Sequence, residues 1–238
     1  MKAVKILFIL FWCGGQLPAQ VRVYDRETFN PELKKELDKV MKRHMQYRRY
    51  IIGASVKTRD SLAKAFGVKT EDVHAHLEKL QAPIDSENME IVTTIIRHYD
   101  YPGKTLVGEP TNLAAAYVIM HSTEGKRYYP RINQSHVMGE VPEFVVAMLE
   151  DHNFVRDGFL QKHGSHAIAV PFLDTNNNRV TMRYYISPIK KGALINTLRR
   201  ERGFTTSIEE YAREIHATYD PNLTWEKVAK MRADAAKK

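Results

Sequence analysis

The sequence predicts a mainly helical α+β fold, and three patterns in the 238-residue chain lead to this expectation. Apolar residues recur at intervals of three and four along most of the chain, which is the spacing of amphipathic helices. Two late runs with strand character, at about 166–173 and 179–186, are joined by the polar segment Asp174-Thr175-Asn176-Asn177-Asn178, which is typical of a hairpin turn. Because no internal repeat or long linker separates these elements, we expect an irregular multi-helix domain with one β-hairpin.

Capping residues and chain breakers set the bounds of the predicted helices. Asn30-Pro31 combines a side-chain cap with a proline in the first turn, so it begins a helix that runs to about residue 50. Gly67, Pro83 and Tyr101-Pro102-Gly103 are each expected to end a helix, and Asp85 or Ser86 to cap the helix after Pro83. The predicted helices cover residues 31–50, 60–66, 70–82, 85–100, 111–120, 126–138, 142–155, 190–202, 207–217 and 224–236.

The first nineteen residues are expected to be a secretory signal peptide. Lys2 and Lys5 precede the apolar run 6–12, and Ala19 is a small residue suited to cleavage. The apolar run is far shorter than the roughly 20 residues that cross a bilayer, so we expect no transmembrane anchor. The mature chain would be periplasmic or secreted. It would comprise an N-terminal helical region, 20–84, packed on the core of a second region, 85–238.

Cys13 is the only cysteine, so no internal disulfide is possible. Cleavage after Ala19 would remove it from the mature chain. The alternative is a lipoprotein anchored through Cys13, although the bulky Phe11 and Trp12 before it do not suit lipidation.

Composition excludes several classes of protein. With 43% hydrophobic residues the chain is too apolar for disorder, and its mean hydropathy of −0.43 is too low for a polytopic membrane protein. The net charge of +8 is spread along the sequence and favours solubility. The tightest basic cluster, Lys42, Arg43, Arg48 and Arg49, is interpreted as a solvated helix face, so no specific nucleic-acid partner is expected. The sequence identifies no other partner and no oligomeric state.

Residues 85–215 carry a series of local motifs in a fixed order. The series comprises Asn88, Ile95-Ile96, Tyr101-Pro102-Gly103, Gly108, an alanine-rich helix ending in His121, Leu149 with Asp151, Gly158, Gln161, Gly164, Pro188-Ile189, Arg199 or Arg200, Gly203 and Tyr211. This order resembles an uncharacterised bacterial domain-of-unknown-function family, the one numbered 6624. The resemblance implies a frequently exported bacterial module and supplies no activity. The chain departs from the family at Met120-His121, at Asp151-His152 and over 161–166, where the family tends to Gln-His, Asp-Arg and Gln-x-Tyr-Gly-Thr-Gln.

His121 and Asp151 are the candidate acid/base pair, because histidine with a carboxylate is the usual pair for proton transfer. His121 ends an apolar helix, and Asp151 lies beside the apolar stripe of another, where a buried acid needs a partner. Gln161 is the third candidate catalytic residue. In the alternative interpretation, which we favour on general grounds, Asp151 fixes His121 or caps a loop and so stabilises the fold.

The turn around Gly164 is the second candidate site. Polar side chains beside a glycine turn suit ligand binding, so His163, Ser165 and His166 are candidate ligand-binding residues. Asn88 and Tyr101, from the family-like series, are added to this set. A weaker hypothesis is a zinc site made of His121, Asp151, His163 and His166, all acceptable zinc ligands. No P-loop, dinucleotide fingerprint or His-Glu-x-x-His motif is present, so no cofactor is expected.

Three functions follow from these residues. The favoured one is an exported binding or interaction module with a polar site around His121, Asp151 and the 161–166 turn. The second is a small hydrolase-like enzyme that uses His121 and Asp151, which predicts the two side chains within hydrogen-bond reach on a pocket floor. The third is a zinc-binding protein.

Overall fold

The computed structural model describes residues 28–51, 54–174, 179–190 and 194–236. The predicted signal peptide, Cys13 and most of the predicted hairpin turn lie outside these ranges. Within them the chain is mainly helical and contains one antiparallel hairpin, β1 (Ala167–Asp174) with β2 (Arg179–Ile186). The predicted mainly-α α+β fold is confirmed, and within the hairpin only the bounds of the first strand shift, by one residue.

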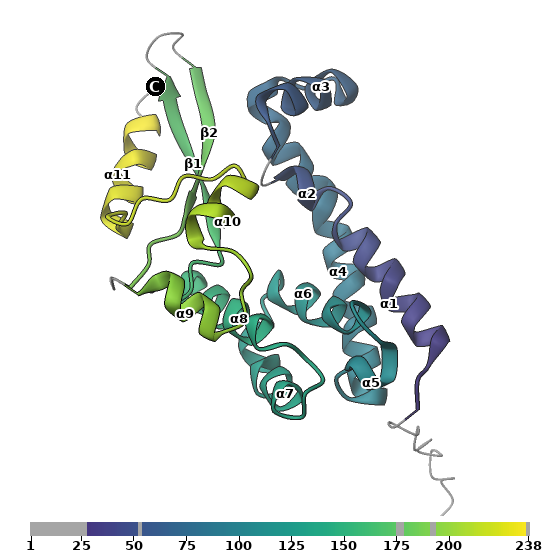
Figure 1. The fold of residues 1–238 in the computed structure, drawn as a ribbon. Helices are drawn as coiled ribbons and strands as arrows, with labels where there is room; N and C mark the ends of the chain where they lie inside the picture. The colour runs from purple at the N-terminus through teal and green to yellow at the C-terminus, as the bar shows by residue number, and fades with distance from the viewer. Residues whose placement is uncertain (1–27, 52–53, 175–178, 191–193, 237–238) are drawn as a thin grey trace, which may run out of the picture.

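The elements form two arms that are joined at one end of the molecule (Figure 1). Helices α1 to α4 run along one side of the molecule, the hairpin and α11 along the other, and α6 to α9 lie between them at one end. The helical elements are α1 (Pro31–His44), α2 (Arg48–Ile51), α3 (Val56–Phe66), η1 (Thr70–Asp72), α4 (Val73–Tyr99), α5 (Lys104–Val107), η2 (Thr111–Leu113), α6 (Ala114–Met120), α7 (Gly125–Val137), α8 (Glu143–Arg156), α9 (Ile195–Glu201), α10 (Ile208–Glu214) and α11 (Trp225–Ala236).

Helix α6 occupies the centre of the largest hydrophobic cluster. Ala115, Ala116 and Ile119 are almost fully buried there, between α1, α4, α7 and α8. Alanine side chains are small, so neighbouring helices approach closely at this point. The short helix α6 is therefore held by packing on its faces, and His121, which caps its C-terminus, lies beside His44 of α1.

Helix α1 begins as predicted, because the Asn30 side chain accepts a hydrogen bond from the Leu33 amide at 3.0 Å. It ends at His44 and not near residue 50. The chain then turns and forms α2, whose Arg48 returns to α4.

The prediction of two helices on either side of Pro83 is wrong. Helix α4 runs without interruption through this proline. An interior proline removes one backbone hydrogen bond and costs about 3 kcal/mol. Packing of both halves offsets this cost, since Leu77 is buried in the N-terminal half and Val92 in the C-terminal half. The Gln81 amide also donates to the Asp85 carboxylate at 2.8 Å across the proline. The predicted regional division at residue 84 thus falls inside one helix.

The hairpin packs against the last helix of the chain. Val170 of β1 is buried with Leu223 and Val228, the latter from α11. On the other edge, β2 exchanges backbone hydrogen bonds with Thr218, from the Thr218 amide to the Tyr184 carbonyl and from the Ile186 amide to the Thr218 carbonyl. Both strands of the hairpin are thereby held against the C-terminal part of the chain. Among the described helices, none has the length and apolar character needed to cross a membrane.

Candidate functional site

Asp151 of α8 is fully buried and is the centre of the polar site. Its Oδ1 accepts hydrogen bonds from the backbone amides of Lys162 at 2.7 Å and His163 at 3.1 Å. Its Oδ2 accepts from the His163 and Ser165 amides, each at 3.1 Å, and from the Ser165 hydroxyl at 2.9 Å. Burial by itself would raise the pKa of Asp151, but the nearby His163 ring and the hydrogen bonds from the Lys162 and Ser165 backbone outweigh it and hold the pKa below its ordinary value. The group is therefore a carboxylate around which the turn is wrapped.

Gln161 fixes the other side of this turn. Its amide nitrogen donates to the carbonyls of His166 at 3.0 Å and Ser187 at 2.7 Å, and its amide oxygen accepts from the His166 backbone at 3.0 Å. The side chain is fully buried. Gln161 therefore joins the turn to the end of β2, and its hydrogen-bonding groups are directed at backbone atoms.

Gly164 is required at the tip of the turn. Its φ of +66° is a left-handed conformation that favours glycine, and an added Cβ would overlap the Cδ1 atom of the buried Ile208. We expect Gly164→Ala to lower the free energy of unfolding by about 2–3 kcal/mol, from backbone strain and overpacking together. Chemical denaturation measures this loss. Gly67→Ala is the matched control, because Gly67 has φ +67° with no atom within 4 Å of an added Cβ; an equal loss in both variants would contradict the role of Ile208.

Arg199 and Tyr211 stabilise the turn by donating hydrogen bonds to its backbone carbonyls. The Arg199 guanidinium donates to the His163 carbonyl at 2.8 Å and to the Thr206 carbonyl at 3.0 Å, and the Tyr211 hydroxyl donates to the Ser165 carbonyl at 2.8 Å. Burial lowers the pKa of Arg199 and raises that of Tyr211 to about 12, so neither is expected to change protonation near neutral pH. Both residues belong to the family-like series, but their role in holding the turn could not be inferred from it.

Two histidines are connected to Asp151, one directly and one through the Ser165 hydroxyl. The His163 Nδ1 atom lies 3.4 Å from Asp151 Oδ1. His166 is linked through Ser165: the Ser165 hydroxyl donates to Asp151, so it accepts from His166 Nδ1 at 3.1 Å. This assigns the proton of a neutral His166 to Nδ1 and leaves Nε2 as the acceptor nitrogen. Burial, and next the nearby His152 ring at 5.3 Å, lower the pKa of His166 to about 3.

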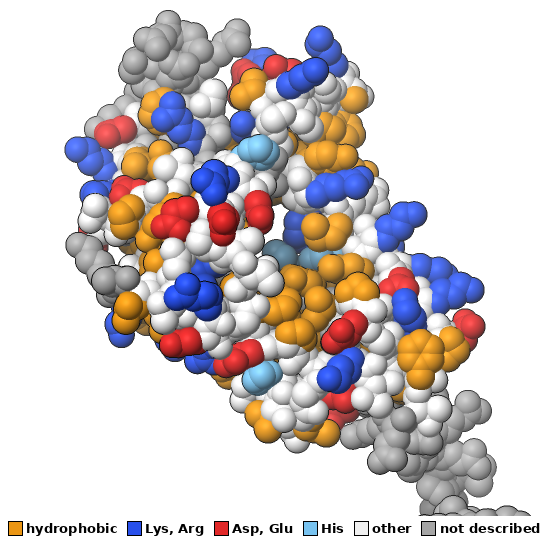
Figure 2. Space-filling model, viewed as in Figure 1, with side chains coloured by type: hydrophobic (Ala, Val, Ile, Leu, Met, Phe, Trp, Pro, Cys, Tyr) orange, Lys and Arg blue, Asp and Glu red, His pale blue; other side chains and the backbone are white. Residues whose placement is uncertain are grey.

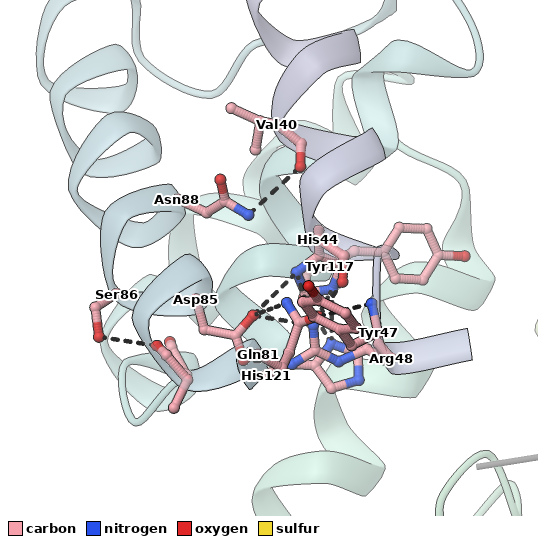
Figure 3. A network of polar contacts seen from close by, with 12 residues as sticks. Val40, His44, Tyr47, Arg48, Gln81, Asp85, Ser86, Asn88, Tyr117 and His121 are labelled. Atoms are coloured by element: carbon pink, nitrogen blue, oxygen red, sulfur yellow. Dashed lines mark hydrogen bonds and ion pairs between the residues drawn. The ribbon is translucent and has the colours of Figure 1, made fainter. Parts of the chain in front are cut away.

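His121 is not hydrogen-bonded or ion-paired to Asp151 in the described part of the chain, so the expected direct contact of this pair is not found. The structure instead places His121 Nδ1 2.9 Å from the Tyr117 carbonyl and 3.2 Å from His44 Nε2 (Figure 3). The physical reason is that the four donors of the 162–165 segment already occupy both Asp151 oxygens. His121 is exposed to solvent, yet nearby protein atoms displace part of the water around its ring, and this desolvation, followed by the Arg48 charge, lowers the pKa of His121 to about 4.

A second polar network, which was not predicted from the sequence, holds His121. Arg48 forms a bidentate ion pair with Asp85 at 3.0 and 2.6 Å and lies 3.1 Å from His44 Nδ1 (Figure 3). His44 is almost fully buried, and burial lowers its pKa to about 2. The sequence does contain a signal for this network. His44 follows Leu33, Leu37 and Val40 at helical spacing, so it lies on the apolar face of α1, where a polar residue needs partners.

Asn88 and Tyr101 lie in the core. The Asn88 amide donates to the Val40 carbonyl at 3.4 Å, and the Tyr101 hydroxyl donates to the Asn112 carbonyl at 2.6 Å. Both side chains are buried, and burial raises the pKa of Tyr101 well above its ordinary value. The structure therefore does not bring these two residues to the 161–166 turn by any described contact.

A cleft of about 1000 Å³ opens where α4 meets the segment between α6 and α7 and the end of α8. We call it the histidine cleft because His121 and His152 line it. Its charged lining residues are Asp85, Glu90, Arg97, Glu124, Arg127 and Arg156. Figure 2 shows histidine side chains at the bottom of a hollow between the two sides of the molecule. Burial lowers the pKa of His152, and Arg156 is the next cause, so the ring is neutral at pH 7.

The zinc hypothesis finds no support in the geometry. In the ranges that the structure covers, no three His, Cys, Asp or Glu side chains are placed to hold a metal ion. The four predicted ligands are divided, since Asp151 and His163 face the inside of the turn while His121 contacts His44.

No protein-family model, curated protein sequence or solved structure matches this chain. The resemblance of residues 85–215 to an uncharacterised bacterial family therefore stays a prediction. The geometry and charge of the site are therefore the basis for its function.

Proposed function

We propose that this protein is an exported binding module and that its ligand is a small molecule with an anionic group, bound in the histidine cleft. The volume of the cleft, about 1000 Å³, is that of a small-molecule site. The observation that carries the proposal is the convergence of two neutral histidines and several arginines from three separate helical segments on one concavity.

The charge of the cleft supports an anionic ligand. Asp85 is neutralised by Arg48, and Glu124 lies 3.1 Å from Arg127. Of the remaining charged lining residues, Arg97 and Arg156 outnumber Glu90, and none of the three forms an ion pair with another residue that the structure describes. Arg156 is held in place by donating to the Thr123 carbonyl at 2.6 Å. A phosphate or carboxylate group would therefore meet the positioned Arg156 and the exposed Arg97.

The test is a titration of the ¹⁵N-labelled protein with inorganic phosphate and with acetate, followed by NMR at constant ionic strength. We expect saturable shifts of the Ser122 and Thr123 amides, and Arg97→Gln should weaken the affinity about tenfold through loss of one charge-assisted contact. Arg232→Gln is the control, because Arg232 is exposed on α11 and does not line the cleft. Shifts that chloride reproduces, or that saturate in Arg97→Gln with the wild-type affinity, would contradict the proposal.

A further inference from the structure

A second cavity, of about 310 Å³, lies beside α9 on the other side of the turn. We call it the α9 cavity. His163 lines it together with Lys162, Lys190 and the apolar side chains of Ile195 and Leu198. It shares no lining residue with the histidine cleft. The proposed binding function does not involve the α9 cavity.

The His163 ring is held from several directions. Its backbone amide donates to Asp151, its carbonyl accepts from Arg199, and its ring stacks on Phe204 with 6.2 Å between centroids and an interplanar angle of 25°. The side chain is almost fully buried. A ring with so little freedom is pre-organised, as a catalytic side chain must be.

Asp151 determines which nitrogen of His163 carries the proton. The Nδ1 atom is buried, lies 3.4 Å from Asp151 Oδ1, and has no conventional hydrogen-bond partner within the described residues. Because Asp151 is an ionised acceptor, a neutral His163 places its proton on Nδ1, facing the carboxylate. The lone pair is then on Nε2, on the opposite edge of the ring. His163 lines the α9 cavity while Nδ1 is buried, so this edge is the one available to the cavity.

We propose that the α9 cavity is a hydrolytic site for small carboxylic esters, with His163 as the catalytic base and Asp151 as its positioning residue. His163 Nε2 takes a proton from water while the water oxygen bonds to the ester carbonyl carbon. The carbon–oxygen bond to the alcohol then breaks, and the same proton passes from Nε2 to the departing alcohol oxygen. The products are a carboxylic acid and an alcohol, and the histidine returns to its neutral state.

Lys190 and the apolar wall define the substrate. Lys190 forms no ion pair within the described chain, whereas Lys162 lies 3.6 Å from Glu150 and Arg202 lies 2.8 Å from Glu143. Its backbone amide donates to the Gln161 carbonyl at 2.9 Å, which anchors it beside the turn. The Lys190 ammonium is thus the cation available to stabilise the negative charge on the carbonyl oxygen during attack. Ile195 and Leu198 favour a short alkyl chain on the acyl side.

The experiment measures hydrolysis of 4-nitrophenyl butyrate by the full chain from the release of nitrophenolate. We expect His163→Gln to lower kcat/KM at least about 100-fold, because a general base contributes 100-fold or more. Lys190→Gln should lower it about 10-fold or more through loss of oxyanion stabilisation. His98→Gln is the matched control, since His98 is exposed on α4 and lines neither cavity.

Lys190 is exposed, so its variant decides the outcome even where His163→Gln does not fold. Hydrolysis by Lys190→Gln equal to that of His98→Gln would overturn the proposal, as would wild-type hydrolysis no faster than that of folded His163→Gln. Neither result would affect phosphate binding at Arg97, so failure of the α9 site and failure of the histidine cleft are distinguishable.

Discussion

Asp151→Asn is expected to lower the free energy of unfolding by about 3–5 kcal/mol, the usual loss when one member of a buried charged contact is removed. The Asp151 carboxylate accepts from four donors and is fully buried. An asparagine has the same shape but replaces one acceptor oxygen by an NH₂ group, which would face backbone N–H donors. At least one of the Lys162, His163 and Ser165 amides would be left buried without a partner. Urea denaturation followed by circular dichroism measures the change.

The control for this substitution is Asp157→Asn at the end of the same helix. Asp157 is partly exposed and pairs with Lys126 at the surface, so its loss should cost less than about 1 kcal/mol. If both variants unfolded at the same urea concentration, Asp151 would not organise the turn, and the geometry assigned to His163 would lose its basis. If Asp151→Asn lost the contact with the His163 ring without lowering the free energy of unfolding, this result would also contradict the role given to this carboxylate.

The fold was largely predictable because local signals carry it. The Asn30 cap, the left-handed Gly67 and the alternation in 179–186 each act on neighbouring residues, and each lies where the structure has a helix end or a strand. Pro83 was misinterpreted for the opposite reason. Whether a proline ends a helix or is accommodated depends on tertiary packing of both halves, here by Leu77 and Val92, and this packing is not encoded in the local pattern.

The sequence identified several polar residues around the 161–166 turn as candidates, but it did not identify their connections. The sequence identified Asp151 as an acid needing a partner, and the structure supplies donors from a turn eleven to fourteen residues later. The partner of His121 is His44, which is 77 residues away in sequence. No spacing rule links positions at such separations. The path of the chain after α8 therefore determines whether His121 or His163 lies next to Asp151.

Protonation of buried histidines is expected to make the fold sensitive to mild acid. His44 and His166 have pKa values near 2 and 3 in the folded protein, chiefly because of burial, whereas a histidine in the unfolded chain has a pKa of about 6.5. Below pH 6.5 the unfolded chain therefore binds more protons than the folded one, and stability rises with pH across this window. The carboxylate of Asp85 does not stabilise a protonated His44. It lies 3.8 Å away and is already paired with Arg48 and hydrogen-bonded to Gln81.

We expect the free energy of unfolding to fall by at least about 3 kcal/mol between pH 7.5 and pH 5, with His44 contributing about 2 kcal/mol and the less buried His121 and His166, whose pKa values are also lowered, contributing the remainder. Asp151 does not contribute in this range, since its lowered pKa matters only below about pH 4. Urea denaturation across the pH series tests the slope. His44→Gln should remove about 2 kcal/mol of this change even where the variant is less stable throughout, and the exposed His98→Gln should leave the change as it is in the wild type. A flat profile in the wild type would mean that His44 accepts a proton in place, which the adjacent Arg48 guanidinium opposes.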